Sequence, residues 1–105
     1  SVYSSYLNPT ETILGVSTCR YYDSADSKLK ECGVIITKEY YNDTNLNNIW
    51  VVMDFDRSEL TFKLIVSTKL KIQSKVLIVT NYESNDISKI YFTDGTSSMK
   101  VINLQ

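Results

Sequence analysis

The feature that most constrains this fold is a series of short apolar segments separated by turns rich in Asn, Asp and Ser. Apolar and polar residues that alternate over four to eight positions are typical of half-buried β-strands, and Asn, Asp and Ser favour turns. The strand-like segments are 12–22, 29–41, 49–55, 75–82, 87–93 and 98–104. We therefore expect a β-rich chain, with a tight hairpin turn at Asp94-Gly95.

Segment 56–73 fits two kinds of secondary structure. At the period of a strand its apolar residues fall on one face, and only Ile65 and Thr68 break the alternation. At the period of a helix it has one polar stripe, formed by Lys63, Ser67 and Lys71. The spacing of Asp56 and Glu59 resembles a helical capping box. Periodicity thus favours a strand and the start signals favour a helix, and both stay open at this point.

Length and charge restrict the classes of function. The chain has 105 residues, enough for one domain spanning 1–105. Its net charge is −1, so we expect no broad basic surface for nucleic acid. It contains no run of about 20 apolar residues, so we expect no membrane insertion. No signal peptide precedes Ser1, which we interpret as processing of a secreted protein.

Catalytic motifs are largely missing. Histidine is absent, which removes the usual general base and the Ser-His and Cys-His nucleophile pairs. Asp54 and Asp56 are a possible carboxylate pair for glycoside hydrolysis, but a helix cap or an exposed strand end is the simpler interpretation. We therefore predict that the chain is not an enzyme and needs no cofactor or metal ion.

Two cysteines, Cys19 and Cys32, lie in strand-like segments joined by the polar turn 23–27. In a hairpin they would face each other near the spacing of roughly 5.5 Å between Cα atoms that a disulfide needs. Two buried free thiols are the alternative. We predict a disulfide, which implies an oxidising compartment.

Several landmarks follow one another in a fixed order. They are a Tyr- and Ser-rich N-terminus, Cys19, Glu31-Cys32-Gly33-Val34, Trp50, an amphipathic segment ending at Gln73-Ser74-Lys75, and Val76-Leu77-Ile78-Val79. This order resembles the B subunits of AB5 toxins of the pertussis, subtilase-cytotoxin and typhoid-toxin type. The resemblance implies an OB-fold-like small barrel with one helix at about 57–72, hence a β-rich α+β fold. The alternative is an all-β barrel or sandwich with no helix.

The same resemblance implies a function. It predicts a non-catalytic, glycan-binding subunit of a secreted bacterial toxin, which passes through the periplasm, forms a homopentameric ring and carries a separate catalytic A subunit. The pore of the ring would be lined by Lys63, Ser67 and Lys71. Host glycans, mainly sialylated ones, would contact Tyr3, Ser4, Ser5, Arg20, Tyr22 and Lys28. The alternative is a monomeric, secreted all-β interaction module, such as an inhibitor, immunity or adhesin domain.

Overall fold

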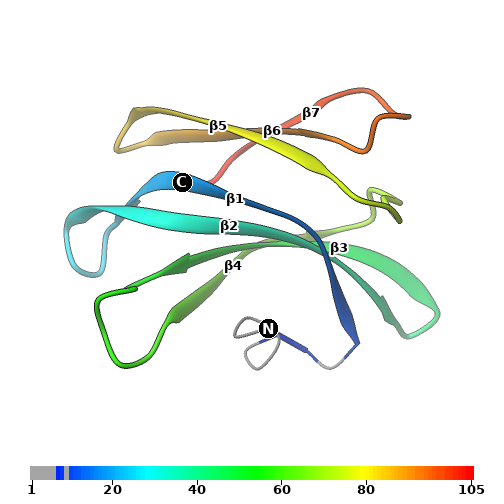
Figure 1. The fold of residues 1–105 in the computed structure, drawn as a ribbon, viewed down its shortest axis with the longest axis horizontal. Coiled ribbons are helices and arrows are strands. Elements are labelled where there is room, and N and C mark those ends of the chain that lie inside the picture. The colour runs from blue at the N-terminus through cyan, green and yellow to red at the C-terminus, as the bar shows by residue number, and fades with distance from the viewer. Residues whose placement is uncertain (1–6, 9) are drawn as a thin grey trace.

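The computed structural model describes residues 7–8 and 10–105, and in this part of the chain it contains seven β-strands and no helix. The strands are β1 (Glu11–Asp23), β2 (Lys28–Tyr41), β3 (Thr44–Met53), β4 (Thr61–Thr68), β5 (Leu77–Ser84), β6 (Ile87–Thr93) and β7 (Lys100–Asn103). Strands β1–β4 form one antiparallel sheet and β5–β7 a second, smaller one (Figure 1). In each sheet, strands that are consecutive in the sequence are neighbours.

The apolar core lies between the two sheets. Its fully buried members come from three strands: Val34 and Ile36 of β2, Ile49 and Val51 of β3, and Ile90 and Phe92 of β6. The sheets meet where β1 lies along β5. There the backbone amide of Val76 donates to the carbonyl of Leu14 at 3.0 Å.

Gly15 permits this close approach. A Cβ atom at position 15 would lie 2.6 Å from the carbonyl oxygen of Val76, which is closer than two such atoms can come. Only glycine, which has no Cβ atom, fits at position 15, because backbone of the other sheet occupies that space.

The predicted helix at 57–72 is wrong. Residues 61–68 form β4, which pairs antiparallel with β3 from Met53 opposite Thr61 to Asn47 opposite Thr68. The segment therefore forms the strand that its alternation indicates. Ile65, one of the two residues that interrupt the alternation, has no partner in β3 and lies at a β-bulge. The apparent capping residues Asp56 and Glu59 lie in the exposed loop between β3 and β4.

The predicted OB-fold-like barrel is also wrong, because the two sheets do not close on each other. A barrel needs edge strands that pair, whereas here β4 and β7 each keep one edge without a partner strand among the described residues. The β-rich expectation and the alternative without a helix are confirmed.

Candidate interaction surface

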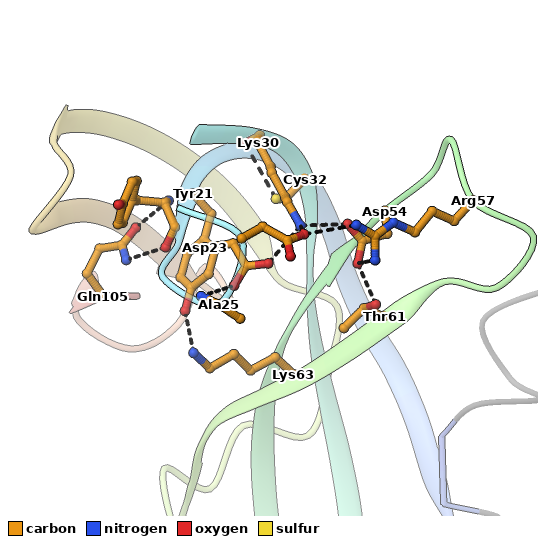
Figure 2. Close-up of polar contacts among 12 residues, drawn as sticks. Tyr21, Asp23, Ala25, Lys30, Cys32, Asp54, Arg57, Thr61, Lys63 and Gln105 are labelled. Carbon is orange, nitrogen blue, oxygen red and sulfur yellow. Dashed lines mark hydrogen bonds and ion pairs between the residues drawn. The ribbon is translucent and has the colours of Figure 1, made fainter. Parts of the chain in front are cut away.

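Lys30 is the centre of an ion cluster at one end of the larger sheet, formed with Asp23, Asp26, Asp54 and Arg57 (Figure 2). Its Nζ lies 2.7 Å from the carboxylate of Asp23, 2.6 Å from that of Asp26 and 2.7 Å from that of Asp54. Arg57 contacts Asp26 at 3.0 Å. The cluster therefore ties the turn after β1 to the loop after β3.

Hydrogen bonding sets the protonation of this ion cluster. The hydrogen bonds that Lys30 donates to the Asp23, Asp26 and Asp54 carboxylates raise the pKa of Lys30 above its ordinary value. The bond from Lys30 lowers the pKa of Asp26 and of Asp54, and for Asp54 the hydroxyl of Thr61, at 2.6 Å, adds to the effect. Lys30, Asp26 and Asp54 thus stay charged near neutral pH and hold one another in place.

The two candidate catalytic carboxylates lie in different surroundings. Asp54 is buried and engaged with Lys30 and Thr61, at a backbone φ of 66°. Asp56 is exposed in the loop. Asp54 therefore anchors a loop. Among residues 7–8 and 10–105, no group of three or more His, Cys, Asp or Glu side chains is placed to hold a metal ion.

Glu11 is the centre of a second polar cluster, which the sequence analysis missed. Its carboxylate accepts hydrogen bonds from the Thr37 hydroxyl at 2.5 Å, Asn48 Nδ2 at 3.1 Å and Trp50 Nε1 at 2.9 Å. Burial alone raises the pKa of Glu11, but these bonds outweigh it, and the pKa lies below its ordinary value. The cluster joins three strands on the larger sheet.

The residues predicted to bind glycans do not form one site in the described part of the chain. Tyr3, Ser4 and Ser5 lie outside the described residues. Arg20 pairs with Glu31 at 3.6 Å and lies over the Tyr82 ring. The backbone of Tyr22 is bonded to the Gln105 side chain, and Lys28 is an exposed residue opposite Asp23.

The predicted pore-lining stripe does not exist, because the helix that would carry it is absent. Lys63 Nζ donates to the Tyr21 hydroxyl at 2.8 Å. Ser67 lies opposite Asn48 in the sheet. Lys71 lies in the loop after β4, at a backbone φ of 63°. The three residues have different partners or surroundings and share no surface stripe.

The predicted disulfide is not formed, and Cys19 and Cys32 are free thiols. The hairpin places them opposite each other, as expected, and both are buried. The Cys32 thiol donates to the Lys30 carbonyl oxygen at 3.5 Å. The hydrogen bond between the two thiols, followed by burial, raises the pKa of Cys32. The same hydrogen bond lowers the pKa of Cys19, so the two thiols differ in acidity.

The smaller sheet turns an apolar surface to solvent, which we call the outer face. It consists of Leu77, Val79, Tyr91, Met99 and Val101. The exposed fractions are 69% for Leu77, 64% for Val79, 63% for Met99 and 55% for Val101. Contiguous exposed apolar patches commonly mark interaction sites. The sequence signal for this surface is the unbroken run Val76-Leu77-Ile78-Val79, which supplies apolar residues to both sides of β5.

Residues 10–105, which include all seven strands, match the family model described as Crassvirus muzzle protein. No curated protein and no solved structure matches the chain. None of the described residues forms a helix that is long and apolar enough to cross a bilayer.

The family match overturns the resemblance to AB5 toxin B subunits. The homopentameric ring, the sialylated host glycans, the separate A subunit and the secreted localisation were wrong predictions that depended on it, and the secreted inhibitor, immunity or adhesin alternative falls with them. The landmarks do not distinguish the toxin subunits from other folds, because a cysteine pair, one tryptophan and an amphipathic segment also occur together in this unrelated β-sandwich. The chain belongs to the Crassvirus muzzle protein family, a family of phage structural proteins.

Proposed function

We propose that this chain is a non-catalytic structural module of a crassvirus virion, where it acts in the muzzle through protein–protein contacts. The observation that carries the proposal is the extent of the family match. It covers residues 10–105 and therefore the whole folded unit, both sheets included.

The geometry supports a structural role in two ways. The ion cluster around Lys30 and the polar cluster around Glu11 fix loops and strands to one another, which gives a rigid scaffold. The outer face then offers an exposed apolar surface on that scaffold. Rigid scaffolds with an apolar patch favour association, because little conformational freedom is lost on binding.

Mass spectrometry of purified virions tests this proposal. Peptides from residues 10–105 are expected at a fixed ratio to the major capsid protein, and the ratio should survive a wash in high salt. A phage-encoded protein that is made during infection but not packaged serves as the control. Peptides found only in the infected-cell lysate and lost from purified virions would contradict the proposal.

A further inference from the structure

The outer face has the same kinds of residue on both sides of its central strand. The strand order is β5-β6-β7, so β6 lies in the middle. The register places Val79 and Val101 on either side of Tyr91. It places Asn81 and Asn103 on either side of Lys89 in the same way.

A third row extends this pattern. Leu77 lies opposite Thr93, and Met99 directly precedes β7 on the other side of β6. When the register of β7 is continued by one residue beyond its last pair, the three rows across the sheet are Leu-Thr-Met, Val-Tyr-Val and Asn-Lys-Asn. Such a surface matches the same surface of a second copy that is rotated by a half-turn about an axis parallel to β6.

We propose that two copies of this chain pack through their outer faces, about a two-fold axis parallel to β6. Such a rotation places β5 of one copy over β7 of the other and keeps the rows aligned. Val79 then faces Val101 of the second copy, and Leu77 faces Met99. Tyr91 meets its own equivalent at the axis. The contact is isologous and closes after two copies.

Charge permits this contact. Lys89 is the one charged side chain in the three rows, and it pairs with Glu83 of its own chain at 3.3 Å. The same rotation brings Lys89 against Lys89 of the second copy at the axis, and the Glu83 carboxylate of each chain offsets this like charge. Interface cores are depleted of charged residues in the same way.

The edges of the sheets favour contact between faces over the addition of strands. β4 carries the bulge at Ile65, and β7 has only four residues. Bulges and short edge strands are both features that block pairing with a strand of another molecule. The outer face carries no such feature, and it presents four apolar side chains of the smaller sheet that are each more than half exposed.

The size of the face sets the strength of the contact. With strands about 4.8 Å apart and a rise of about 3.4 Å per residue, the three rows cover about 300 Å² per copy. The pair would bury about 600 Å², half the lower limit of about 1,200 Å² for stable complexes. The isolated chain should therefore dimerise weakly. This part of the inference rests on the proposed function, since in a virion neighbouring contacts would strengthen the pairing.

Sedimentation velocity on the isolated chain tests the pairing. We expect the mean mass to rise from one chain towards two between about 10 μM and about 1 mM, the range in which so small an interface dissociates. Val79→Asp and Val101→Lys should each weaken association by at least about tenfold, because each buries an unpaired charge.

Mixing the two variants tests the geometry. In the mixed dimer the carboxylate introduced at position 79 faces the ammonium introduced at position 101, so an equimolar mixture should associate again. Val16→Asp is the control, since Val16 is 52% exposed on β1 of the larger sheet and should leave association unchanged.

Three results would overturn the inference: a monomer over the whole concentration range, association that neither variant affects, or a mixture that does not recover. These results are separable from a failure of the proposed function. A monomeric chain that is still found in virions contradicts only the pairing. A chain that dimerises but is missing from virions contradicts only the structural role.

Discussion

At the scale of single residues, two charged side chains organise the larger sheet. Lys30 gathers three carboxylates, and Glu11 gathers three neutral side-chain donors. Neither cluster was predictable from the sequence. Asp54 is 24 positions from Lys30, and Trp50 is 39 positions from Glu11. Only the pairing of strands brings such distant residues together, and composition carries no information about it.

The pKa of Glu11 gives a testable pH dependence. Because folding lowers this pKa, the ionised carboxylate stabilises the fold above its unfolded pKa of about 4.3, and that stability is lost as the pH falls below this value. Glu11→Gln should lower the free energy of unfolding at pH 7 by about 1–2 kcal/mol. The difference from the parent chain should shrink towards pH 3.

Urea unfolding at pH 7 and at lower pH measures this effect. Glu59→Gln, at an exposed loop position, is the control and should unfold like the parent at both pH values. A deficit for Glu11→Gln that stays constant with pH would show that shape, not charge, matters at this position.

At the scale of elements, alternation predicted most strands well. The expected segments 12–22, 29–41 and 87–93 correspond closely to β1, β2 and β6. The connection after β6 was expected as a tight turn, whereas it spans 94–99, where Asp94 accepts the amides of Thr96 and Ser97. The error at 57–72 arose because the toxin resemblance was given more weight than the period-2 pattern. The outer face was missed because a strand with apolar residues on both sides is normally buried on both.

The junction between β1 and β5 gives a prediction for this scale. Gly15→Ala places a Cβ against the Val76 carbonyl and must shift backbone, so it should destabilise the fold by about 1–3 kcal/mol. Gly33→Ala is a matched control. Its Cβ would meet Phe55 Cζ at 3.7 Å, an ordinary contact, and should change stability by less than about 1 kcal/mol. Chemical denaturation of both variants decides the matter, and equal effects would contradict this account of the junction.

At the scale of the whole molecule, one core joins both sheets. Phe92 of the smaller sheet is fully buried together with Ile49 and Val51 of the larger sheet. Because the sheets share this core, neither has a separate apolar interior of its own. The two sheets are therefore expected to unfold together, as one cooperative unit.

Phe92→Ala tests this cooperativity. It should cost about 3–5 kcal/mol, because it leaves a cavity in the core. The loss should appear equally in the fluorescence of Trp50, which reports on the larger sheet, and in far-UV circular dichroism. Val79→Ala, on the exposed side of the smaller sheet, should change stability by less than about 1 kcal/mol. A Trp50 transition that Phe92→Ala leaves unchanged would show that the sheets unfold separately.

The order of strands within each sheet also bears on how the chain folds. Every ladder joins strands that are consecutive in the sequence, so each pair of neighbouring strands is a hairpin. Each hairpin can nucleate at its own turn, and loop-closure entropy is larger for the contacts of β1 with β5 and β6, which join strands far apart in the sequence. The shared core forms only when the two sheets come into contact, and this contact is expected to cost the most loop-closure entropy. Nucleation at the hairpin turns shortens the time during which unpaired strand edges are exposed to other chains and can misassemble.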